Sequence, residues 1–80
     1  MKQRHIQQAK RAASDDAFTA FATDVGSRLR IALSARFGPE LGAEATADAL
    51  LYAWQHWERV RGLKNPAGYL YRVGSRGAES

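Results

Sequence analysis

The most constraining feature of the sequence is an apolar stripe that recurs at three- and four-residue steps between residues 18 and 37. Its members are Phe18, Phe21, Ala22, Val25, Leu29, Ala32, Leu33 and Phe37. That spacing follows the α-helical repeat of about 3.6 residues and predicts one long amphipathic helix. Ser14 and the two aspartates after it suit a helix start, and Gly38-Pro39 suits a helix end. We therefore predict a helix over residues 14–37, in which Gly26 either weakens the helix or permits close packing of a neighbour.

Two further helices are predicted downstream. Residues 41–61 carry a second apolar face, formed by Thr46, Leu50, Ala53, Trp54, Trp57 and Val60. Both tryptophans are at core spacing, so we expect them in the core and not as platforms for bases. Gly62 ends this helix, and Asn65-Pro66 caps and opens a third one, in which Leu70 and Val73 point inward. The predicted fold is all-α, a compact bundle of three or four helices.

The first 13 residues lack a convincing core pattern and carry four basic side chains. We treat residues 1–13 as a basic N-terminal extension and residues 14–80 as the helical domain. The extension is predicted to be either a frayed continuation of the helix or a disordered arm. As an arm it is either a solvated tail or a contact to DNA.

Several function classes are disfavoured by what the 80 residues contain. There is no cysteine, no apolar run long enough for a membrane span and no secretory signal, so we expect a cytoplasmic protein with no membrane partner. His5 and His56 are far apart and lack a carboxylate at ligand spacing. No catalytic constellation, metal site or cofactor motif is recognisable, and we predict that the chain is not an enzyme.

Charge is distributed in blocks along the chain. Residues 38–58 carry four acidic side chains and no lysine or arginine, whereas residues 59–80 carry five basic side chains and one glutamate. Two partners of opposite charge are one interpretation, and a solvated helix with a harmless charge bias is the other.

The basic block has aromatic residues interleaved with arginine, a combination that suits phosphate neutralisation and base stacking. The candidate DNA-binding residues are Arg59, Arg61, Lys64, Asn65, Tyr69, Arg72 and Arg76. Asn65 could contact a base edge, although helix capping explains it without a ligand. Tyr52 lies on the predicted polar face of the second helix, where it either contacts a protein or lies along its own helix.

Taken together, residues 15–77 resemble region two of the extracytoplasmic-function (ECF) class of bacterial sigma factors. The resemblance is carried by Ala53-Trp54, Trp57, the Gly62–Lys64 loop, Asn65-Pro66, Tyr69-Leu70 and Tyr71-Arg72-Val73, with Phe18, Leu29 and Phe37-Gly38 upstream. It implies a helical domain that binds the clamp helices of the RNA polymerase β′ subunit. It also implies recognition and melting of the promoter minus-ten element, held as a single strand, during transcription initiation. An anti-sigma factor is a further partner to consider.

On this resemblance, the clamp-binding helix corresponds to about Glu44–Trp57. The implied polymerase contacts are Glu44, Asp48, Leu51, Tyr52 and Gln55. The minus-ten reader corresponds to the Gly62–Asn65 loop and the helix that begins at Pro66. The chain departs from the family at Ala47, where many members carry glutamine, and at Gly74-Ser75-Arg76, where members usually carry Ala-Arg-Asn.

The resemblance includes no promoter-upstream helix-turn-helix domain (region four). We therefore expect a fragment of a longer sigma factor. The alternative is a sigma-like protein-interaction module, a decoy or a self-associating protein, without promoter recognition.

Overall fold

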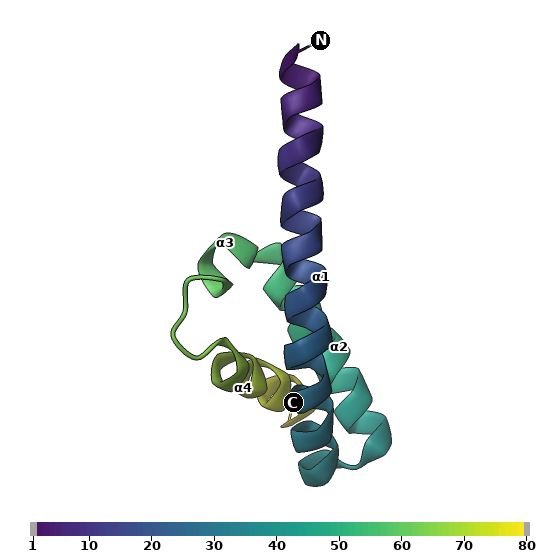
Figure 1. The fold of residues 1–80 in the computed structure, drawn as a ribbon. Helices are drawn as coiled ribbons and strands as arrows, with labels where there is room; N and C mark the ends of the chain where they lie inside the picture. The colour runs from purple at the N-terminus through teal and green to yellow at the C-terminus, as the bar shows by residue number, and fades with distance from the viewer. Residues whose placement is uncertain (1, 80) are drawn as a thin grey trace.

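A computed structural model describes the backbone of residues 2–79 and the side chains of residues 15–79. All regular structure in residues 2–79 is helical, which confirms the all-α prediction. The elements are α1 (Lys2–Phe37), α2 (Pro39–Gln55), α3 (Trp57–Val60) and α4 (Pro66–Glu79). α2, α3 and α4 gather along the C-terminal half of α1, whose N-terminal turns extend beyond them (Figure 1).

The predicted start of the first helix at residue 14 is wrong, because α1 begins at Lys2 and passes through residues 14–16 without a break. Alanine, glutamine and lysine upstream are good helix formers, so the helix continues there although no apolar stripe requires it. The backbone of residues 2–13 therefore matches the predicted helical extension. Whether those side chains form an arm that contacts DNA lies outside the described residues.

The core is formed where α1 and α2 approach each other closely. Its buried apolar residues are Val25, Leu29, Leu33, Ala45, Ala49, Ala53, Val60 and Leu70. At Gly42 the two backbones are so close that an added Cβ would lie 2.4 Å from the Cα of Ser34. At Gly26 an added Cβ would lie 3.2 Å from Cδ1 of Leu50, which supports the prediction that this glycine permits close packing. Three of the five buried residues of α2 are alanines.

Because the two helices approach so closely, the predicted apolar face of the second helix is only partly buried. Thr46, Ala53 and Val60 are buried as expected. Trp54, expected in the core, is 46% exposed and contacts Phe18 edge-on with 4.9 Å between ring centroids. Trp57 is half-buried against the same phenylalanine. A large indole does not fit the narrow seam between the helices, so both rings lie at its border.

The prediction of one helix over residues 41–61 is also wrong, both in where the helix begins and in its continuity. It begins earlier, with Pro39 in its first turn, and it is interrupted at His56, where φ is −120° and ψ is 34°. α3 follows this break and buries Val60, while Trp57 packs against Phe18 and against Phe21. The break therefore turns the chain toward the loop that leads to α4.

α4 packs against both α1 and α2. The close contact is at Gly74, where an added Cβ would lie 2.9 Å from Cδ1 of Leu33 and 3.1 Å from the carbonyl oxygen of Ala45. Leu70 is fully buried as predicted, whereas Val73 is only half-buried. Glycine at residue 74 thus has a packing reason, because a larger residue would separate α4 from the other helices.

Across residues 2–79, no helix combines the length and the apolar character that a bilayer span requires.

Candidate nucleic-acid and protein interfaces

The loop between α3 and α4 is held by the N-terminal cap of α4. The Gly68 amide donates a hydrogen bond to Oδ1 of Asn65 at 3.1 Å, and the Tyr69 amide donates to the Asn65 carbonyl at 3.2 Å. This confirms the predicted capping role of Asn65. An added Cβ at Gly68 would lie 2.6 Å from Nδ2 of Asn65, so the glycine leaves room for the capping side chain.

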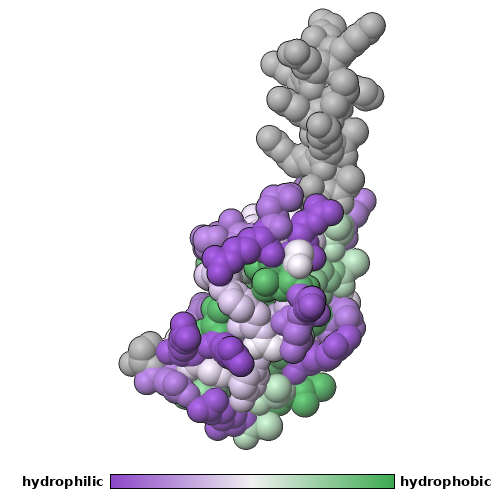
Figure 2. Space-filling model, turned by 90° about the vertical axis from the view of Figure 1, so that its left-hand side faces the viewer, coloured by the Kyte–Doolittle hydropathy of each residue, from purple (hydrophilic) through white to green (hydrophobic). Residues whose placement is uncertain are grey.

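Beside this cap lies a pocket of about 280 Å³, which we call the loop pocket. It is lined by Leu63, Lys64, Asn65, Gly68, Tyr69 and Arg72. Four of the seven candidate DNA-binding residues thus come together, supplying two cations, an amide and an aromatic ring. Figure 2 shows this side of the molecule, where strongly hydrophilic side chains surround a smaller area of intermediate hydropathy.

Tyr69 is fixed in the pocket wall by two polar neighbours. Its hydroxyl is 2.9 Å from the Tyr52 hydroxyl, and it accepts a hydrogen bond from Nη2 of Arg59 at 3.3 Å. The Arg59 guanidinium also lies 5.7 Å from the centroid of the Tyr69 ring. Arg59 therefore reaches the pocket indirectly, through Tyr69.

Tyr52 is half-buried and contacts α4, although the sequence placed it on a polar outer face. The hydrogen bond with Tyr69 raises the pKa of Tyr52 above its ordinary value, burial raises it further, and the nearby Arg59 opposes the shift. Tyr52 is consequently neutral at physiological pH. Tyr52 joins the helix expected to meet polymerase to the pocket expected to meet DNA.

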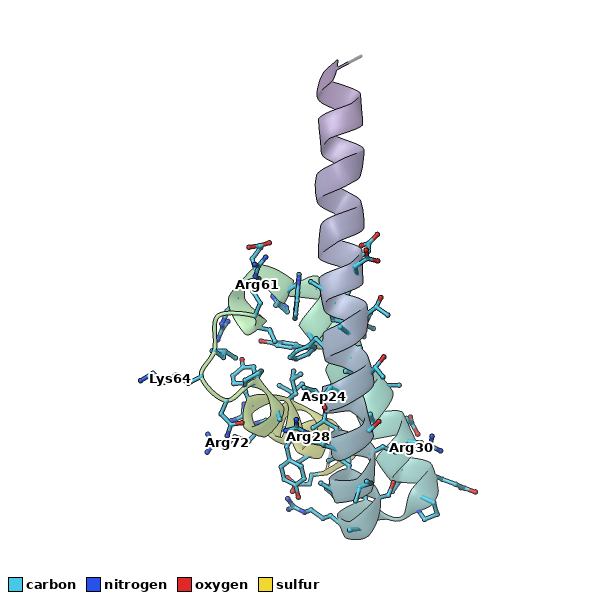
Figure 3. The ribbon with its side chains drawn as sticks, viewed as in Figure 1. Asp24, Arg28, Arg30, Arg61, Lys64 and Arg72 are labelled. Atoms are coloured by element: carbon cyan, nitrogen blue, oxygen red, sulfur yellow. The ribbon has the colours of Figure 1, made fainter. Side chains whose placement is uncertain are left out.

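The two remaining DNA candidates lie elsewhere. Arg61 is the C-cap residue that follows α3, and its Nη1 is 3.7 Å from a carboxylate oxygen of Glu58, in an exposed pair (Figure 3). Arg76 lines a second hollow, described below, together with Arg72. Sequence reasoning missed Arg36 and Ser75, which line the same hollow, because nothing in the spacing relates the end of α1 to the middle of α4.

The candidate polymerase contacts form an exposed strip along α2. Steps of three and four residues place Glu44, Asp48, Leu51 and Gln55 on one side of the helix, where all four are exposed. Leu41, which sequence reasoning missed, extends this strip and is 48% exposed, while Leu51 is 56% exposed. We call these five residues the outer strip; Tyr52 lies at its border with α4.

The two carboxylates of the outer strip are available for a partner. Among the described residues, neither Glu44 nor Asp48 forms a salt bridge. They line a hollow of about 220 Å³ together with Leu41, Ala45 and two residues of α4. Two leucines beside two unpaired acids suit a partner that offers both positive charge and apolar surface.

Over the part of the chain whose side chains are described, no group of three His, Cys, Asp or Glu side chains is placed to hold a metal ion. Comparisons of the chain with protein-family models, with curated proteins and with solved structures found no match.

Proposed function

We propose that the chain is a sigma-factor region-two module that binds the β′ clamp helices of RNA polymerase and the single-stranded minus-ten element of a promoter. The observation that carries the proposal is the loop pocket, in which Lys64, Asn65, Tyr69 and Arg72 converge. The second support is the outer strip, which provides a separate acidic surface on another helix.

In this proposal the loop pocket receives a base that has left the duplex stack. The Tyr69 ring offers an aromatic face, and stacking on such a face contributes about 1–3 kcal/mol per base. Lys64 and Arg72 neutralise phosphates on either side of that base. Unstacking costs a few kcal/mol, which these contacts offset only for a strand that fits the pocket. The pocket therefore captures an opened strand in preference to a duplex.

The outer strip would bind the polymerase. A basic coiled coil can place its cations against Glu44 and Asp48 while its apolar side chains cover Leu41 and Leu51. Charge complementarity of this kind sets the orientation and speeds association. Because the strip and the loop pocket share no residue, clamp helices and DNA can bind at the same time.

The DNA side of the proposal is tested with two single variants, Lys64→Ala and Arg72→Ala. Each should weaken binding of a fluorescent single-stranded minus-ten oligonucleotide about tenfold, or ~1.4 kcal/mol. Each should also reduce the slope of log affinity against log salt by about 0.7, the value for one lost contact to a single strand. Fluorescence anisotropy over a range of salt concentrations measures both quantities.

Arg30→Ala is the matched control, because it removes one positive charge from an exposed side chain of α1 on the far side from Lys64 and Arg72 (Figure 3). We expect its affinity to stay close to that of the unmodified protein. Equal losses in all three variants would show that net charge alone governs binding, and the assignment of the loop pocket would fail.

A further inference from the structure

The hollow that Arg76 lines, of about 160 Å³, lies between the last turn of α1 and the middle of α4. Its lining consists of Arg36, Tyr71, Arg72, Ser75 and Arg76, and we call it the arginine hollow. Three guanidinium groups from two helices therefore meet at one small site. Among the described residues, Arg72 and Arg76 form no salt bridge, so two of the three have no fixed counter-charge.

Ser75 gives the hollow an unusual polar group. The residue is only 6% exposed, and its hydroxyl has no hydrogen-bond partner among the described residues. Helical hydroxyls commonly bond to the carbonyl four residues earlier, as those of Thr23, Ser27 and Thr46 do here. A buried hydroxyl without a partner costs about 1–3 kcal/mol. Ser75 thus keeps a free donor beside three cations.

Arg36 is held in place by its surroundings. Nη2 donates to a carboxylate oxygen of Glu79 at 2.5 Å, and the guanidinium lies 5.0 Å from the centroid of the Phe37 ring. A hydrogen bond with the Tyr71 side chain raises the pKa of Arg36, burial opposes this, and the charge of Glu79 adds to it. Arginine has five donor hydrogens, so a single carboxylate leaves others for a second anion.

We propose that the arginine hollow is a binding site for a phosphate group, held by Arg36, Arg72 and Arg76 with Ser75 as an additional donor. The planar guanidinium fork suits the tetrahedral oxygens of phosphate, and charge-assisted bonds of this type are about twice as strong as neutral ones. The Ser75 hydroxyl is covered by its neighbours, so its contribution is smaller than that of the cations. Glu79 competes with the anion for Arg36.

The natural source of this phosphate is the backbone of the DNA strand, a point that rests on the proposed function. Arg72 lines both the loop pocket and the arginine hollow. A strand with one base in the loop pocket would therefore continue along α4 and place a neighbouring phosphate in the hollow. The site would fix the direction of the strand without reading its sequence.

The site itself is tested with inorganic phosphate. Titration of the full chain, followed by the NMR signals of arginine side chains, should show saturable binding at Arg36, Arg72 and Arg76. Arg36→Gln should weaken binding at least tenfold and Ser75→Ala about threefold, whereas Glu79→Gln should strengthen it. Arg30→Gln, which removes the same charge elsewhere on α1, should bind phosphate like the unmodified protein.

The Ser75→Ala variant distinguishes an effect on folding stability from an effect on phosphate binding. Loss of an unpaired buried hydroxyl and gain of a better helix former should leave the melting temperature unchanged or raise it. Lower phosphate affinity together with undiminished stability supports a binding role. If Arg36→Gln and Ser75→Ala both bind phosphate as tightly as the unmodified protein, there is no such site.

The source of the phosphate is tested with minus-ten oligonucleotides that carry one neutral methylphosphonate linkage at successive positions. At one position, the neutral linkage should weaken binding of the oligonucleotide to the unmodified protein about tenfold. The same linkage should have no effect on binding to the Arg36→Gln variant. If no position does so while inorganic phosphate still binds, the hollow takes free phosphate and its assignment to the DNA strand is overturned. Lys64 lines the loop pocket and is not part of the lining of the arginine hollow, so the effect of Lys64→Ala on DNA binding is independent of this result.

Discussion

Replacing Gly42 with alanine is expected to lower the free energy of unfolding by about 2–3 kcal/mol, the cost of overpacking a tight contact. The new Cβ would lie 2.4 Å from the Cα of Ser34 and 2.5 Å from its amide nitrogen. Because these are backbone atoms, no side chain can turn aside, and α1 and α2 have to separate. In a chain of 80 residues, whose stability is small, this leaves a large unfolded fraction. Urea denaturation followed by circular dichroism measures the change.

Gly77→Ala is the matched control. An added Cβ at Gly77 would meet no atom within 4 Å, and alanine is favoured over glycine inside a helix by about 1 kcal/mol. The same substitution should therefore leave stability unchanged or raise it. If Gly42→Ala were as stable as Gly77→Ala, the close crossing of α1 and α2 would not exist in solution.

Reversing both charges of the outer strip, with Glu44→Lys and Asp48→Lys together, is expected to weaken binding to the β′ clamp helices at least a hundredfold. The variant replaces two attractive pairs with two repulsive ones at the centre of the proposed contact, and each like-charge juxtaposition costs several kcal/mol. Both residues are exposed and form no salt bridge in the described part of the chain, so folding should be unaffected. Calorimetry with a β′ clamp-helix fragment measures the affinity.

The control is the pair Asp15→Lys and Asp16→Lys, which changes the net charge by the same amount on exposed positions of α1. This control should bind the clamp helices normally. Equal weakening by both double variants would refute the outer strip as the docking surface. No clamp binding by the unmodified protein, together with concentration-dependent self-association, would favour the alternative of an interaction module without promoter function.

The fold could be predicted as far as local sequence determines it. Apolar spacing located the helices, and Gly38 and Asn65 located two of their boundaries, because caps act over a few residues. The start of α1 was missed, since helix-forming residues extend a helix without any core pattern. The break at His56 was also missed: the residues around it have no strong breaker, and the turn buries Val60.

The candidate sites also differ in how far local sequence could predict them. The loop pocket is built from residues 63–72, which are close in sequence, and four of its six lining residues were among the predicted DNA-binding residues. The arginine hollow joins residues 36 and 76, and the tyrosine pair joins Tyr52 to Tyr69. These contacts depend on how the helices cross, and the crossing depends on Gly42 and Gly74. No periodicity in the sequence indicates that geometry.

The central claim is that a single-stranded minus-ten element lies in the loop pocket. The most direct measurement is an NMR titration of the isotope-labelled chain with that oligonucleotide, followed at every assigned backbone amide. The largest shift changes are expected at residues 63–72, with little change along the outer strip at residues 41–55. Changes concentrated on the outer strip, or spread equally over all basic residues including Arg28 and Arg30, would contradict the claim.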